Sequence, residues 1–158
     1  MASKSLLPNR SVTAQQNALY LLGARPRFVD PTIWVRLHYY SRFRKIVNYL
    51  EANSACVVNL AALAKVGCMS TTAFSKLFKV KIGITVKYFV SAYKISKAHE
   101  IMINSDLSIT EITNALGFVS LSTFERTFQR ITGQTPSQYR IGILKTREIL
   151  PCDHKGCS

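Results

Sequence analysis

The chain has 158 residues, 47% of them hydrophobic, and its 21 Lys and Arg exceed its 8 Asp and Glu by 13 charges. This length predicts one domain with tails, and the apolar content favours a hydrophobic core over a disordered chain. No apolar stretch reaches the ~20 residues of a membrane span, and the apolar run at 18–23 is too short for a secretory signal, so we expect a cytoplasmic protein. The positive excess favours an anionic partner, nucleic acid first, because each neutralised phosphate releases counterions. An anionic membrane surface and simple solubility are the alternatives.

The four cysteines do not form a metal-binding pattern. Cys56, Cys68, Cys152 and Cys157 contain no Cys-x-x-Cys pair, so a structural zinc site is not predicted. In a reducing cytoplasm we expect free thiols, with Cys56 and Cys68 filling the core among apolar neighbours. A metal or redox role stays open for Cys152 and Cys157, which flank His154. We expect no cofactor.

Residues 1–40 predict an extension of uncertain structure. Residues 12–22 are compatible with a short helix, whereas 28–40 combine aromatic and β-branched residues and are interrupted by Pro31. We expect this segment to be partly ordered and to pack on the main domain. Its aromatic residues could instead form a dimer surface; these are Phe28, Trp34, Tyr39 and Tyr40.

From Ser41 onwards the apolar spacing is helical and no sustained two-residue alternation appears. The sequence therefore predicts an all-α fold of about seven helices. Capping residues and glycines mark the boundaries. The expected caps are Asn59, Ser70, Ser108 (in a capping box with Glu111), Ser120 and Thr135, and the expected breaks are Gly67, Gly83, Gly117 and Gly133. A long helix is predicted from about Thr85 to Asn104.

The chain repeats itself at an offset of 50 residues, or 49 in the helix that precedes each cap. The matched pairs are Leu60 and Ile109, Leu63 and Ile112, Ser70 and Ser120, Thr72 and Ser122, Phe74 and Phe124, Lys76 and Arg126, Phe78 and Phe128, Gly83 and Gly133, and Thr85 and Thr135. One residue of slack in the intervening turn explains the change of offset. Each half reads as a short helix, a tight turn, a capped second helix and a glycine stop, which is the order of a helix-turn-helix.

The long helix between the halves has about 20 residues at ~1.5 Å each, so it spans roughly 30 Å. Successive major grooves on one face of B-DNA are about 34 Å apart. The spacing predicts that one chain can hold two reading helices one DNA turn apart. A monomer would then bind an asymmetric site, although a dimer through residues 1–40 remains an alternative.

Residues 41–143 resemble the DNA-binding domain of the AraC/XylS family, with 144–158 as a C-terminal tail. The residues that carry the likeness are Gly117-Phe118, Ser120, Phe124, Arg126, Phe128, Gly133 and Thr135-Pro136-Ser137-Gln138-Tyr139-Arg140. The resemblance implies two helix-turn-helix subdomains joined by a linker helix. It also implies a bacterial transcription regulator, usually an activator, with double-stranded DNA and RNA polymerase as partners.

Three features depart from the family pattern. Thr113 stands where alanine is usual at a tightly packed position, which predicts looser packing of the second unit. Lys94 stands where arginine is commoner, which keeps the charge but would lose a bidentate contact. The roughly 40 leading residues cannot build the companion domain of small-molecule sensors, so an effector is not expected. The chain is similar to single-domain members or to a shortened relative.

In each predicted reading helix the paired aromatic residues define the buried side, so the opposite, exposed side is the predicted DNA-binding face. Matching the family motif predicts base contacts from Thr72, Ser75 and Lys76 in the first helix and from Leu121, Ser122, Glu125 and Arg126 in the second. Phosphate contacts are expected from Ser70, Ser120, Thr123 and Lys79. Thr71 and Arg130 complete the predicted DNA-binding set.

Each of these side chains has a plainer interpretation. Surface Ser and Thr are often only solvated or capping, and Glu125 could instead orient a neighbouring cation. Two other classes also remain open. A DNA-repair alkyl-transfer protein uses a similar module but needs a reactive cysteine, and a helical adaptor would bind protein through the same face. No paired carboxylates, phosphate loop or nucleophile triad stands out, so we expect no enzyme.

Overall fold

The computed structural model describes residues 27–53 and 58–149, and this part of the chain is helical without strands. Its helices are α2 (Pro31–Tyr39), α3 (Ser41–Ala52), α4 (Leu60–Val66), α5 (Thr71–Ile82), α6 (Val86–Asn104), α7 (Ile109–Ala115), α8 (Leu121–Thr132) and α9 (Pro136–Ile149). The all-α prediction is confirmed. The seven helices expected from Ser41 onwards are α3 to α9, and α2 is an addition to them.

Helix α2 corrects the interpretation of Pro31 as an interruption. Pro31 occupies the first turn of the helix, where a missing N–H costs nothing, and the Asp30 carboxylate caps the helix by accepting from the Thr32 N–H at 2.8 Å. The helix buries Ile33, Trp34 and Leu37 in the core. Residues 28–40 are therefore part of the folded domain.

The aromatic residues considered as a dimer surface are mostly used within the chain. Trp34 is 1% exposed, and Phe28 and Tyr40 pack against the core. Tyr39 alone of the four points outward, with 80% of its surface exposed. The predicted helix at 12–22 and the cysteines Cys56, Cys152 and Cys157 lie outside the described residues.

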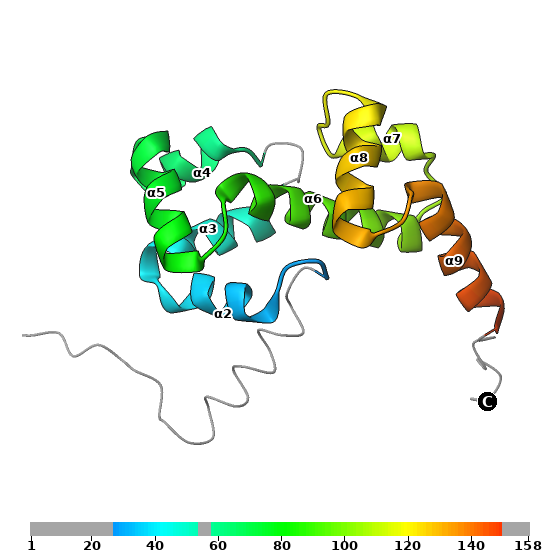
Figure 1. The fold of residues 1–158 in the computed structure, drawn as a ribbon, viewed down its shortest axis with the longest axis horizontal. Helices are drawn as coiled ribbons and strands as arrows, with labels where there is room; N and C mark the ends of the chain where they lie inside the picture. The colour runs from blue at the N-terminus through cyan, green and yellow to red at the C-terminus, as the bar shows by residue number, and fades with distance from the viewer. Residues whose placement is uncertain (1–26, 54–57, 150–158) are drawn as a thin grey trace, which may run out of the picture.

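The fold consists of two helical units that share α6 (Figure 1). The first unit contains α2 to α5 and the second contains α7 to α9, while α6 contacts α4 and α5 on one side and α8 on the other. At about 1.5 Å per residue, the 19 residues of α6 extend ~28 Å. The predicted linker helix is thus present at the predicted length.

Aromatic packing holds the first unit together. Phe78 lies 5.4 Å from Phe43 and 5.5 Å from Phe89 between ring centroids, which joins α3, α5 and α6. Tyr93 of α6 donates from its hydroxyl to the Leu50 carbonyl of α3 at 2.6 Å. Burial raises the pKa of Tyr93 to about 12, so this hydroxyl keeps its proton and its role as donor.

Helices α5 and α8 end as the sequence predicts. Gly83 closes α5 at φ 94° and Gly133 closes α8 at φ 79°, both in the left-handed region that glycine adopts without strain. Arg36 of α2 adds a second closure to α5, because its Nη1 donates to the Ile82 carbonyl at 3.2 Å. The C-terminal ends of α5 and α8 are therefore fixed.

Candidate nucleic-acid interface

The two units contain the same helix-turn-helix, formed by α4 with α5 and by α7 with α8. In the first turn the N–H groups of Cys68 and Met69 donate to Lys65 and Ala64, at 3.0 Å each. The second turn repeats both bonds at an offset of 49, from Gly117 to Asn114 at 2.9 Å and from Phe118 to Thr113 at 3.1 Å. The internal repeat of the sequence is thus a repeat of backbone geometry.

The turns also show where the one residue of slack lies. Cys68 at φ 55° is the left-handed residue of the first turn, and Gly117 at φ 63° is its counterpart. Between this position and the cap, the first turn has only Met69 and the second has Phe118 and Val119. Val119 is the additional residue, and it is 97% exposed.

Gly67 ends α4 as expected, as its C-cap at φ −75°. One expectation for the first turn was wrong. Cys68 was expected in the core, yet its side chain is exposed, because the left-handed turn directs it outward. Among the described residues, Cys68 is a free cysteine.

Helix α5 presents the predicted reading face of the first unit. Phe74 and Phe78 are fully buried and fix the inner side of the helix. Opposite them, Thr71, Thr72, Lys76 and Lys79 are exposed and Ser75 is half-buried. Hydroxyl and ammonium groups on one exposed side can donate to base edges and phosphates.

Helix α8 has the same division in the second unit. Phe124 and Phe128 are fully buried. The exposed side carries Leu121, Ser122, Thr123, Glu125, Arg126 and Arg130. Within the described part of the chain, Glu125 forms no ion pair with either neighbouring arginine, which leaves its carboxylate and both guanidinium groups open to a ligand.

Ser70 and Ser120 cap the N-terminal ends of α5 and α8, and a phosphate contact would be an additional role for the same hydroxyl groups. The Ser70 hydroxyl accepts from the Ala73 N–H at 3.3 Å, and the Ser120 hydroxyl accepts from the Thr123 N–H at 3.2 Å. Thr123 adds a hydroxyl contact of 2.9 Å to Ser120. These caps fix the N-terminal ends of α5 and α8, whose amides and positive dipole ends favour an anion.

The capping box predicted at the start of α7 is confirmed. The Ser108 N–H donates to the Glu111 carboxylate at 2.7 Å, and the Glu111 N–H donates to the Ser108 hydroxyl at 3.2 Å. Hydrogen bonds from the Ser108 side chain and then from the Ser108 backbone lower the pKa of the Glu111 carboxyl. The negative charge therefore stays at the helix N-terminus, where the dipole stabilises it.

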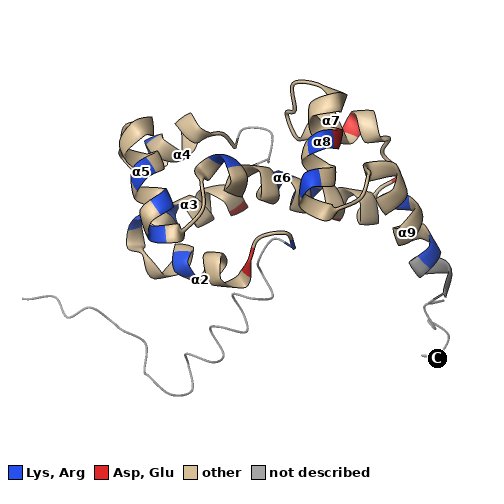
Figure 2. Cartoon of the chain, viewed as in Figure 1, with Lys and Arg blue, Asp and Glu red and all other residues tan. Residues whose placement is uncertain are grey.

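Basic side chains are concentrated on the first unit (Figure 2). Beyond Lys76 and Lys79, sequence reasoning did not single out the exposed cations of α3 and the end of α5, which are Arg42, Arg44, Lys45 and Lys81. The second unit mixes signs, because Asp106, Glu111 and Glu125 accompany its arginines. Comparing the net charge of the two halves of the chain, rather than taking the net charge of the whole, would have indicated these cations.

The departures Lys94 and Thr113 are both accommodated. Lys94 is buried on α6, and its Nζ lies 5.4 Å from the ring centroid of Phe118, so it stacks on an aromatic face at the joint of the units. The buried Thr113 hydroxyl donates to the Ile109 carbonyl at 2.8 Å. Each polar group thus has a partner.

Residues 63–141 match a family of proteins described as a helix-turn-helix domain. The chain is 31% identical over 102 residues to the virulence regulon transcriptional activator VirF of Yersinia enterocolitica, covering 65% of this chain and 38% of that protein. It is 38% identical over 74 residues to the HTH-type transcriptional regulator ExsA of Pseudomonas aeruginosa, covering 47% of this chain and 27% of that protein. The chain therefore spans about 38% or less of the length of these relatives.

Solved structures share the fold. The C-terminal domain of the two-component response regulator yesN from Fusobacterium nucleatum is 26% identical, with a TM-score of 0.55 over 61% of this chain and 95% of that one. The DNA-binding domain of AdpA, in complex with a target DNA, is 22% identical, with a TM-score of 0.60 over 68% of this chain and 96% of that one. The second likeness concerns the fold alone.

Proposed function

The chain belongs to the AraC family of helix-turn-helix proteins, and we propose that it regulates transcription by binding double-stranded DNA in a sequence-specific way. The observation that carries the proposal is the pair of equivalent turns that hold α5 and α8 with their buried aromatic sides inward. What remains outside is a hydroxyl and ammonium face on α5 and a face with a guanidinium and a carboxylate on α8. Such groups read base edges in a major groove.

The geometry supports one chain reading two adjacent major grooves. Because α6 is ~28 Å long and groove repeats are ~34 Å apart, α5 and α8 can enter neighbouring grooves on one side of the duplex. The two faces differ in side chains, Lys76 standing where the second unit has Arg126. Because one chain carries both helices and their side chains differ, we expect a monomer to occupy an asymmetric site of roughly two DNA turns.

The charge distribution assigns different shares to the two units. The first unit, with Lys76, Lys79 and the cations of α3, supplies most of the phosphate attraction in this proposal. The second unit, which also carries Glu125, contributes more to base choice through Arg126 and Leu121. Thr72, Ser75 and Ser122 complete the set of residues proposed to contact bases. The proposed DNA-binding surface also includes Thr71, Thr123 and Arg130.

The experiment compares Arg126→Ala with wild type on a duplex selected from random sequence. We expect a loss of about 1–3 kcal/mol in specific binding and relaxed choice at one base pair. Arg126→Lys keeps the charge without the bidentate fork and should lose most of the specificity while keeping more of the affinity. Lys145→Ala, which removes an exposed cation of α9, is the matched control. Unchanged affinity and base choice in Arg126→Ala would refute the placement of α8 in a groove.

Salt dependence separates DNA binding from an adaptor role. Binding to duplex DNA should weaken linearly in log–log form with salt, since each phosphate contact releases counterions, whereas an apolar protein interface would lack this slope. An alkyl-transfer enzyme is not favoured, because the relatives are named as regulators. In the described segments, no group of three or more His, Cys, Asp or Glu could hold a metal ion.

We further propose activation, through contact with RNA polymerase, as the regulatory outcome. The support is the name of VirF as a transcriptional activator. Such a regulator would act in the cytoplasm, and no helix in the described ranges has the length and apolarity to cross a membrane. In vitro transcription from a template carrying the selected site tests the sign: increased transcript supports activation, and decreased transcript contradicts it.

A further inference from the structure

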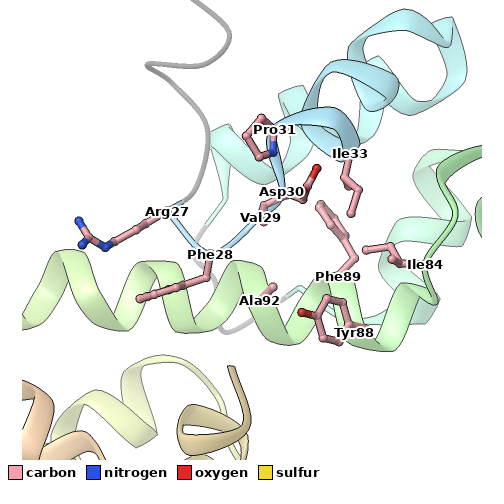
Figure 3. Close-up of a pocket in the computed structure, with 10 residues that line it drawn as sticks. All are labelled: Arg27, Phe28, Val29, Asp30, Pro31, Ile33, Ile84, Tyr88, Phe89 and Ala92. Carbon is pink, nitrogen blue, oxygen red and sulfur yellow. The ribbon is translucent and has the colours of Figure 1, made fainter. Parts of the chain in front are cut away.

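The segment that precedes α2 reaches from the first unit to the second. Residues 27–30, called the strap below, run along α6 above a cavity of about 490 Å³ (Figure 3). The floor of the cavity includes Phe89 and Ala92 of α6. The Phe28 N–H of the strap donates to the Ser96 hydroxyl of α6 at 2.9 Å.

The Phe28 ring completes an aromatic cluster that also contains residues of α6, α8 and α9. Its centroid lies 5.9 Å from the ring of His99 and 6.2 Å from the ring of Tyr139, both edge to face. The Tyr139 hydroxyl and His99 Nδ1 share a hydrogen bond of 2.9 Å, and Tyr139 packs on Phe128 at 5.3 Å. Such aromatic pairs contribute about 0.5–1.5 kcal/mol each beyond their buried area.

This cluster matters because the units meet over little else. Within the described ranges, none of the helices α2 to α5 forms an extensive interface with α7, α8 or α9, and the main contacts between units pass through α6. The angle between the units therefore depends on how each unit packs on α6. The strap supplies a second connection, from the start of α2 to α9.

We propose that the strap, through Phe28, fixes the angle between the two reading helices and so sets the half-site spacing that the protein accepts. Phe28 is in this sense a positioning residue that touches no DNA. The spacing part rests on the proposed function, because it requires two helices in two grooves. The rigidity part concerns the free protein and is independent of it.

The first test measures rigidity without DNA. Residual dipolar couplings are recorded by NMR on the full chain for wild type, Phe28→Ala, and Tyr39→Ala as the matched aromatic truncation at an exposed position. We expect one alignment tensor to fit both units in wild type and in Tyr39→Ala, and two tensors to be required for Phe28→Ala. Phe28→Tyr, which keeps the ring, should restore one tensor. A single tensor for folded Phe28→Ala would overturn the proposal.

The second test measures spacing. The selected duplex is compared with duplexes that have one base pair inserted or removed between the half-sites, which turns one half-site by about a tenth of a helical turn. Wild type should lose about tenfold or more in affinity on the altered duplexes, as for a broken base contact. Phe28→Ala should bind the best duplex more weakly but lose less than about threefold on changing the spacing.

The outcomes distinguish the two proposals. Absence of duplex binding by wild type would refute the function, while the dipolar couplings would still decide the role of the strap. Normal binding with an identical spacing profile in wild type and Phe28→Ala would refute the spacing role and leave the function intact. Thermal unfolding of each variant checks that Phe28→Ala remains folded.

Discussion

Replacing Cys68 by glycine should stabilise the protein, although it removes a side chain. Cys68 lies at φ 55°, where a residue with a Cβ is strained by about 1–2 kcal/mol, and its exposed side chain gives little packing in return. Glycine would remove the strain but add about 0.5–1 kcal/mol of conformational freedom to the unfolded chain. The difference is a net gain of about 0.5–1 kcal/mol. For a chain of this size it corresponds to a rise in Tm of about 1–4 °C.

The assay is urea unfolding followed by circular dichroism, in reducing buffer, with Gly117→Ala as the counterpart. Gly117 occupies the equivalent position of the second turn at φ 63°, so alanine there should destabilise by about 1 kcal/mol. A shift in the urea midpoint at unchanged slope reports stability. If Cys68→Gly lowers the midpoint, the left-handed φ of Cys68 does not strain the folded protein enough to outweigh the added freedom of glycine, and the reasoning fails.

Burial, and then the charge of Arg27, lower the pKa of His99, so the unfolded chain binds this proton more readily than the folded chain. The free energy of unfolding should therefore fall as pH drops below about 6.5, until the lowered pKa is passed. His99→Gln should flatten this part of a profile of urea midpoint against pH, and an unaltered slope would contradict the prediction. Lys79→Ala should weaken all duplexes alike and reduce the salt slope by about 1, measured by anisotropy titration, and a loss confined to one sequence would argue against a phosphate contact. Light scattering of the complex on a minimal duplex should give one chain per site, whereas two chains would assign an interface to a surface other than the buried Trp34.

Local hydrogen bonds explain why so much of the secondary structure can be read from the sequence. The caps at Ser70, Ser108 and Ser120 join residues three apart, and the stops at Gly83 and Gly133 depend on the φ of a single residue. Such features need no knowledge of distant parts of the chain. The burial pattern of the paired phenylalanines likewise follows from helical spacing, and it defines the exposed faces of α5 and α8.

Other features were decided only by tertiary structure. The sequence around Pro31 permits either an extended segment or a helix start, and the burial of Trp34 against the core favours the helix. The sequence predicts one additional residue in the second turn without giving its position. The backbone pairs Cys68 with Gly117, so the additional residue follows this left-handed position.

The joint between the units is the clearest case. Phe28 and Ser96 are 68 residues apart, and Tyr139 and His99 are 40 apart, so no local pattern relates them. By itself the sequence determined the helices α5 and α8, their exposed faces and the length of the helix between them, because these depend on neighbours along the chain. Only the packed chain decided the angle at which the helices are held, because that angle depends on which distant side chains meet.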